Sequence, residues 1–248
     1  MKKVNMEMGV GVSIIQNFAD HPHELYKALA EFIDNSIQAY HDEKTKMDKL
    51  YRSRDEKLVI RINYNKAMKT LEILDNSTGI YEETLRQAFL VGTKMNRKNA
   101  DLSLGQFNMG FKTAAVWLCD IYEIDTKRHD EEKKLEVVVD HKTINTSDST
   151  LALAAGSTNE KGNKSYTHFR LSELKHDFSA ATIDKTKNYL SSIYRHLFKG
   201  IKIIFDGQEL TWTDFNFQID DKTKKPMKWN LDIGYLNPKD RNSPQISG

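Results

Sequence analysis

The stretch Ala30-Glu31-Phe32-Ile33-Asp34-Asn35-Ser36 lies within a helical pattern and carries the first residues suited to chemistry. Pro22 directly precedes this pattern, whose buried side recurs every 3.6 residues through Leu25, Leu29, Phe32, Ile33, Ser36, Ile37 and Tyr40. Glu31 and Asn35 are four residues apart, so they are neighbours on a face away from this apolar side. A carboxylate beside an amide can act as general base and magnesium ligand, although two solvent-facing side chains explain such a pair more simply.

A second stretch, Leu74-Asp75-Asn76-Ser77-Thr78-Gly79-Ile80, follows directly after an apolar strand pattern. Taken alone it is explained by an ordinary turn, because Asp, Asn, Ser and Gly are common turn residues. An aspartate at a strand end can also accept a hydrogen bond from the exocyclic amine of adenine. Gly79 lets the main chain approach a flat ring closely. Asp75 is therefore a candidate nucleobase ligand.

A third stretch, Leu104-Gly105-Gln106-Phe107-Asn108-Met109-Gly110-Phe111-Lys112, runs into a helix rich in small residues. Main-chain N–H groups at a helix start bind anions, and glycine lets a phosphate come close. A loop with a glycine hinge is the alternative. The stretch is neither a Walker loop, which needs Gly-Lys-Ser/Thr, nor a dinucleotide fingerprint that opens a βαβ unit.

In this order the three stretches resemble the nucleotide-binding boxes of the GHKL (Bergerat-fold) ATPases. That superfamily includes gyrase B, the ninety-kilodalton heat-shock chaperones, MutL, MORC proteins and sensor histidine kinases. The resemblance covers about residues 20–175 and is closest to MORC-like domains, chiefly through Glu-Phe-Ile-Asp-Asn-Ser in the first box and Gly-Phe-Lys in the third.

The resemblance implies a role for each matching residue. Glu31 would polarise the attacking water, Asn35 would hold Mg²⁺, Asp75 would take the adenine amine with Gly79 under the ring, and residues 91–104 would form the ATP lid. The implied nucleotide contacts are Asn35, Asp75, Gly79, Lys94, Gly105, Gln106, Phe107, Asn108, Met109, Gly110, Phe111, Lys112 and Thr167. Four positions depart from the usual family pattern: Gln38, Ser77, Asn108 and Tyr166. Ser77 and Asn108 replace glycines and are expected to reshape the pocket.

The patterns predict an α+β fold, a Bergerat-fold sandwich of a mixed, mostly antiparallel sheet with helices on one face. Residues 41–57 are expected to form a solvated helix extension or a loop. Helices are expected at Glu82–Leu90, near Phe111–Leu118 and near Ala181–Phe198. Strands are expected at Leu58–Tyr64, Thr70–Leu74, Ile121–Thr126, Leu135–Asp140, Leu151–Ala155, Tyr166–Leu171, Ile201–Phe205 and Glu209–Thr213. Residues 1–220 are predicted to form the ATP-binding domain, and residues 221–248 a linker or the start of a following domain.

Composition narrows the class of protein. Among 248 residues, 37 basic against 35 acidic side chains leave a net charge of +2, so no overall field favours nucleic acid or an anionic membrane. The apolar runs are too short to cross a bilayer. A single cysteine, Cys119, excludes an intramolecular disulfide, and the N-terminus lacks an apolar signal core, so we expect a cytoplasmic protein, or a nuclear one in a eukaryote.

The resemblance implies an ATPase that hydrolyses ATP to ADP and phosphate with Mg²⁺ and works as a conformational and dimerisation switch. The isolated chain is expected to be slow, since it is too short for a full transducer domain, which supplies a lysine in some relatives. The implied partners are ATP and ADP, a second copy of the chain, and downstream domains or proteins, with DNA reached through them. One alternative is a nucleotide sensor without hydrolysis. A GHKL-type protein kinase is another, against which Glu31 argues because histidine kinases typically carry Asn there.

Overall fold

The computed structural model describes residues 2–8, 24–89, 110–142, 151–213, 222–223, 232–235 and 245–247. The predicted lid at 91–104, Lys94 and the part of the third box from Gly105 to Met109 lie outside these residues. The chain divides into two compact units, Met1–Trp212 and Thr213–Gly248. In the second unit β10 (Asp232–Tyr235) pairs antiparallel with β11 (Gln245–Ser247). The assignment of residues 221–248 as a linker or the start of a further domain stays a prediction.

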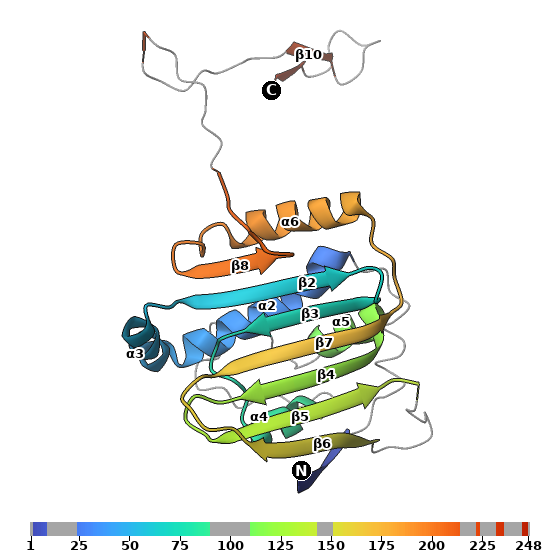
Figure 1. Cartoon of the computed structure of the whole chain (residues 1–248). Helices are drawn as coiled ribbons and strands as arrows, with labels where there is room; N and C mark the ends of the chain where they lie inside the picture. The colour runs from blue at the N-terminus through green and yellow to red at the C-terminus, as the bar shows by residue number, and fades with distance from the viewer. Residues whose placement is uncertain are drawn as a thin grey trace. The chain divides into compact units, whose positions relative to one another are not determined.

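The first unit is an α+β structure built on one nine-stranded sheet, in the order β1-β6-β5-β4-β7-β3-β2-β8-β9 (Figure 1). Among the described strands of this sheet, β2 and β8 pair parallel and the other neighbours pair antiparallel. The strands are β1 (Lys2–Met8), β2 (Leu58–Asn65), β3 (Thr70–Asp75), β4 (Cys119–Lys127), β5 (Lys133–Asp140), β6 (Leu151–Asn159), β7 (Tyr166–Leu174), β8 (Ile201–Phe205) and β9 (Gln208–Glu209). The predicted fold class is thereby confirmed.

The helices are α2 (Leu25–Asp42), α3 (Lys44–Arg54), α4 (Glu82–Phe89), α5 (Gly110–Leu118) and α6 (Ala180–Tyr194). In Figure 1, α2 and α5 run behind the sheet. The predicted apolar side of α2 is buried against the sheet, where Phe32 meets Phe169 of β7 edge to face at 5.0 Å between ring centroids. Together with alternately buried residues of β2 and β3, this side forms the hydrophobic core.

The order of strands decides which segments meet. Because β7 lies between β3 and β4, Thr167 is paired with Asp75 on one side and with Thr126 on the other. Asn76 secures the turn after β3, since its Oδ1 accepts from the amide of Val59 at 2.7 Å and its Nδ2 donates to the carbonyl oxygen of Lys57 at 3.0 Å. The second box is thus attached to the start of β2.

Several predicted boundaries need correction. The helix expected to reach Phe198 ends at Tyr194, because a turn over residues 195–200 leads into β8. The strand expected at Glu209–Thr213 is only the two-residue β9, which pairs with β8 across Asp206 and Gly207. Residues 44–54, in the region left open as helix or loop, form α3. The N-terminal strand β1, which pairs with β6, was not predicted at all.

None of the described helices combines the length and apolar character needed to span a membrane.

Candidate nucleotide site

Asp75 ends β3 and lies almost completely buried at the base of the candidate site. Its Oδ1 accepts a hydrogen bond from the amide of Ser77 at 2.8 Å, and its Oδ2 accepts one from the hydroxyl of Ser36 at 2.6 Å. Burial raises the pKa of Asp75 to about 6 despite these donors, and no basic side chain of the described residues pairs with it. The carboxylate therefore keeps acceptor capacity for an N–H group of a ligand.

Ser77, which stands where the family usually has glycine, links the first two boxes. Its side chain is buried, and its hydroxyl donates to the main-chain carbonyl oxygen of Ser36 at 3.0 Å. The same residue holds Asp75 through its amide. The departure from the family pattern thus adds a hydrogen bond between α2 and the second box.

Gly79 occupies a position that only glycine fits. Its φ is +72°, and a Cβ atom placed there would lie 2.0 Å from the main-chain oxygen of Lys127. The side chain of Lys127 is itself buried and donates to the carbonyl oxygens of Gly162 at 2.7 Å and Lys164 at 3.0 Å. The second box therefore packs against the end of β4, and Lys127 holds the turn that leads into β7.

Thr167 is buried beside Asp75, and its hydroxyl lies 3.2 Å from that of Thr126 on β4. The Thr126 hydroxyl accepts from the amide of Ile80 at 3.0 Å and contacts the carbonyl oxygen of Tyr166 at 2.9 Å. These bonds connect β4, β7 and the residue after Gly79. They give this end of the site a fixed polar wall.

Glu31 lies on α2 against the first residue of α5. A Cβ atom at Gly110 would lie 1.8 Å from its Oε2, so this glycine makes room for the carboxylate. Asn35 follows one turn further along α2 and is partly exposed. The pKa of Glu31 is raised, first by burial and then by the negative charge of Asp34. Oxygen ligands on one face of a helix suit a hard cation. The start of α5, where Gly110 leaves space, suits phosphate oxygens.

Lys112, expected near the phosphates, is almost fully buried in the second position after the start of α5. Its Nζ is shielded from solvent and has no hydrogen-bond partner among the described residues. Burial lowers the pKa of Lys112 to about 8. A buried cation of this kind is costly unless an anion joins it. Its neighbour Phe111 turns its ring into the core, 5.8 Å from that of Phe169, so this side chain contributes packing.

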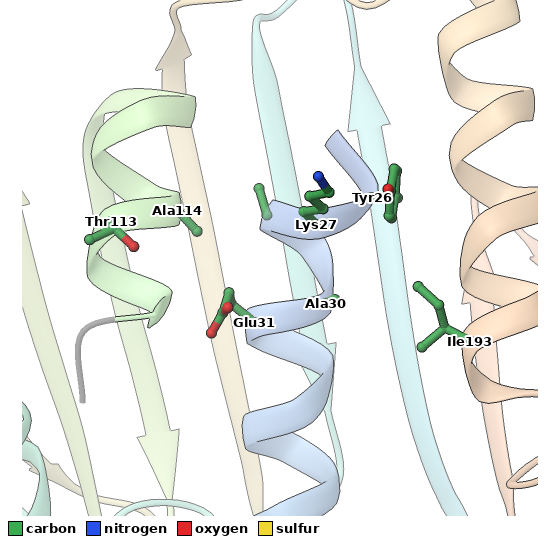
Figure 2. Close-up of a pocket in the computed structure, with 8 residues that line it drawn as sticks. Tyr26, Lys27, Ala30, Glu31, Thr113, Ala114 and Ile193 are labelled. Carbon is green, nitrogen blue, oxygen red and sulfur yellow. The ribbon is translucent and has the colours of Figure 1, made fainter. Parts of the chain in front are cut away.

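A groove of about 320 Å³ opens along the outer side of α2 between α5 and α6. Figure 2 shows Glu31 on the side of α2 that faces α5, while Ile193 of α6 points toward α2. Tyr26, Lys27, Ala28, Ala30, Thr113 and Ala114 complete the lining. Glu31 therefore lies where this groove meets the start of α5.

A separate group of potential metal ligands, Glu43, His129 and Asp130, has atoms within 4.8 Å of one another. The buried guanidinium of Arg128 lies between the two carboxylates, 2.7 Å from Glu43 and 2.9 Å from Asp130. Because this cation already compensates the acids, we interpret the group as an ion-pair network that joins the α2–α3 junction to the β4–β5 turn.

Comparisons with known proteins identify the family and the fold. Residues 23–168, more than half of the chain, match the family model described as "Histidine kinase-, DNA gyrase B-, and HSP90-like ATPase". The chain belongs to this family. The ATPases that this description names give the carboxylates and glycines above their chemical context. A search among curated proteins found no match.

Solved structures show the same fold. The ATPase region of Saccharomyces cerevisiae topoisomerase II superposes with a TM-score of 0.51 at 16% identity, covering 75% of this chain and 48% of that chain. The ATPase and transducer domains of DNA topoisomerase II from Balamuthia mandrillaris give a TM-score of 0.53 at 14% identity, with the same two coverages. The chain therefore spans about half the length of these neighbours.

Among the predicted site residues, the structure brings Asp75 and Thr167 together in the sheet and Glu31 and Gly110 together at the helices. Three residues that border the site were not predicted as site residues: Ser36, Thr126 and Lys127. Ser36 follows Asn35 within the first box, so the motif could have identified it as a site residue. Thr126 and Lys127 end an ordinary strand pattern, and only strand order shows that they border the second box.

Proposed function

We propose that the chain is a Mg²⁺-dependent ATPase that hydrolyses ATP to ADP and phosphate. The observation that carries the proposal is the buried Asp75 carboxylate, which is held at both oxygens by Ser36 and Ser77 and pairs with no cation among the described residues. A carboxylate held in this way can accept a hydrogen bond from an N–H donor such as the adenine amine. By family analogy, Gly79 lies under the adenine ring.

The phosphate end is assigned to the two helices. We place the polyphosphate at the start of α5, where Gly110 removes the side chain that would otherwise fill the space beside Glu31. The Lys112 ammonium, which has no partner within the described part of the chain, gives this end a positive charge that an anion would stabilise. Lys94 and the residues from Gly105 to Met109 complete the assignment by family analogy.

Glu31 is the proposed general base. Its carboxylate accepts a proton from a water molecule as the water oxygen forms a bond to the γ-phosphorus. The bond from that phosphorus to the bridging oxygen then breaks, and its electron pair leaves with ADP. The raised pKa of Glu31 makes it a better base than a glutamate with an ordinary pKa.

The residues present fit a magnesium ion, because Asn35 offers an amide oxygen on the face that carries Glu31. When bound with ATP, the ion neutralises charge on the phosphate oxygens. Within the family we place the chain nearest the MORC proteins, on the Glu31–Ser36 and Gly110–Lys112 segments. By the same analogy, ATP drives a conformational and dimerisation switch that acts on further domains or partners.

The test is calorimetric titration with ATP and Mg²⁺, followed by phosphate release, on the wild type, Glu31→Ala and Asp75→Asn. We expect Glu31→Ala to bind ATP with little change and to lose hydrolysis. We expect Asp75→Asn to lose at least about tenfold in affinity, because an amide replaces the charged acceptor. Glu56→Ala, on an exposed glutamate after α3, is the matched control. Binding of ATP with equal affinity by wild type and Asp75→Asn would contradict the adenine assignment.

A further inference from the structure

Three paired residues form a polar row across the sheet at the nucleobase end of the site. Asp75 of β3 pairs with Thr167 of β7, which in turn pairs with Thr126 of β4. Directly paired residues of antiparallel strands place their side chains on the same face of a sheet. All three side chains are buried, and Ser36 of α2 donates to Asp75 from above this face. The row therefore decides which hydrogen bonds this end can offer to a ligand.

Thr126 has one hydroxyl proton and three polar neighbours. The carbonyl oxygen of Tyr166, at 2.9 Å, can only accept, so Thr126 donates to it. The amide of Ile80, at 3.0 Å, can only donate, so Thr126 accepts from it. If the proton pointed elsewhere, two oxygen atoms would face each other at hydrogen-bond distance with no hydrogen between them. The proton of Thr126 is thus directed at Tyr166.

This assignment fixes the direction of the contact between the two threonines. Their hydroxyl oxygens are 3.2 Å apart, and distance alone would allow either to donate. Because the proton of Thr126 already points at Tyr166, Thr167 is the donor and Thr126 accepts with its second lone pair. The Thr167 oxygen then has only lone pairs left, so it can accept from a ligand but cannot donate to one.

The neighbouring groups have the same polarity. The ionised carboxylate of Asp75 can only accept. The hydroxyl of Ser36 donates to Asp75, that of Ser77 to the carbonyl oxygen of Ser36, and that of Thr78 to the carbonyl oxygen of Gly79. Each of these hydroxyl protons is therefore directed at an acceptor of the protein. Within the described residues of this row and of the second box, the hydroxyl groups offer a ligand acceptors.

We propose that Thr126 is a positioning residue that makes the Thr167 hydroxyl an acceptor and so favours a 6-aminopurine nucleotide over a 6-oxopurine nucleotide. An exocyclic amine has two N–H groups, which can donate to Asp75 and to Thr167. An oxygen in its place would face an acceptor at Thr167. The inference rests on the proposed function, because it takes the nucleobase to lie against Asp75 and Thr167. Thr126 itself does not need to touch the nucleotide.

The test compares ADP with IDP, each with Mg²⁺, in calorimetric titrations of the full chain at neutral pH. IDP carries an oxygen where ADP carries the exocyclic amine. Both are diphosphates, so the measurement does not depend on turnover at the γ-phosphate. We expect the wild type to bind ADP at least about tenfold more tightly than IDP, because the oxygen leaves acceptors facing each other.

Thr126→Val keeps the shape of the side chain and removes the hydroxyl. The proton of Thr167 is then free to turn toward the ligand. We expect the affinity for IDP to rise about three- to tenfold, the size of one hydrogen bond, while the affinity for ADP stays equal or falls. A purely structural loss would weaken both nucleotides and leave their ratio unchanged.

Two variants serve as controls. Thr126→Ser keeps the hydroxyl and should keep the wild-type ratio of ADP to IDP affinity. Thr186→Val removes a buried threonine hydroxyl from α6, outside the row, and should leave the ratio unchanged. In the double variant Thr126→Val with Thr167→Val, the gain in IDP affinity should disappear, because Thr167 is the donor that produces it.

Thr167→Val alone gives a second test that leaves Thr126 intact. It removes the acceptor that faces position 6 of the purine, so the preference for ADP should fall at least about threefold. An unchanged ratio in Thr126→Val or in Thr167→Val, or an equal change in Thr126→Ser, would overturn the inference. ADP binding by the wild type would still stand in those cases. A wild type that binds neither ADP nor ATP would overturn the proposed function and this inference with it, so the two failures are distinguishable.

Discussion

Replacement of Gly79 by alanine tests the close approach between the second box and the end of β4. The structure implies two separate costs. A φ of +72° is unfavourable for alanine by about 1–2 kcal/mol. The added Cβ would also meet the main-chain oxygen of Lys127 at 2.0 Å, and relief of such a contact by main-chain shifts costs about 1–3 kcal/mol more.

The sum, about 2–5 kcal/mol, is a large part of the roughly 5–15 kcal/mol that stabilises a typical domain. Gly207 provides a matched control that separates the two costs. Its φ is +78°, and a Cβ there would have no atom within 4 Å. Gly207→Ala should therefore lose only the conformational part, about 1–2 kcal/mol.

The assay is urea unfolding of both variants and the wild type, monitored by circular dichroism and compared at equal m-values. We expect Gly79→Ala to lose clearly more free energy of unfolding than Gly207→Ala. It should also bind ATP at least about tenfold more weakly, because Ile80 and its bond to Thr126 must move with residue 79. Equal losses of stability in the two variants would show that the contact with Lys127 does not constrain Gly79, and the reasoning would be refuted.

Two further changes separate hydrolysis from binding and charge. In Gly110→Ala the new Cβ would meet the flexible end of Glu31 at 1.8 Å and displace it. We therefore expect hydrolysis to fall at least about tenfold, while the free energy of unfolding stays within about 1 kcal/mol of wild type. Full activity in a phosphate-release assay would contradict this placement of Glu31. Burial lowers the pKa of Lys112 to about 8, so above that pH the lysine is largely neutral without nucleotide, and pairing with phosphate should raise its pKa and take up a proton. Calorimetry at pH about 8.5 in two buffers of different ionisation enthalpy should detect this uptake in wild type and not in Lys112→Met, and equal uptake by both would remove Lys112 from the phosphate site.

The sequence predicted most accurately those elements whose structure depends on neighbouring residues alone. The apolar period of residues 25–40 predicted α2, and the strand patterns at 58–64 and 70–74 predicted β2 and β3. Both follow from side-chain direction within a single element. The three boxes likewise identified the family from residue types in order. The N-terminal strand was missed because β1 forms by pairing with β6, which lies far along the chain.

The end of α6 shows the same limit. Its apolar pattern continues toward Phe198, yet the chain must turn at residues 195–200 to bring β8 beside β2. Sheet pairing therefore overrode a local helical preference. The hydrogen bond that the Tyr194 hydroxyl donates to Asp34 of α2 follows from this tertiary arrangement and not from either segment alone.

By itself, the sequence determined the fold class, the family and the identity of Glu31, Asp75 and Gly79 as candidates, because motif chemistry and periodicity depend on neighbouring residues. Only the tertiary structure decided that Gly79 packs against Lys127, that Gly110 makes room for Glu31, and that Thr126 joins Thr167 beside Asp75. These contacts connect segments that are distant in the chain. Their geometry is set by strand order and helix packing, which no local pattern specifies.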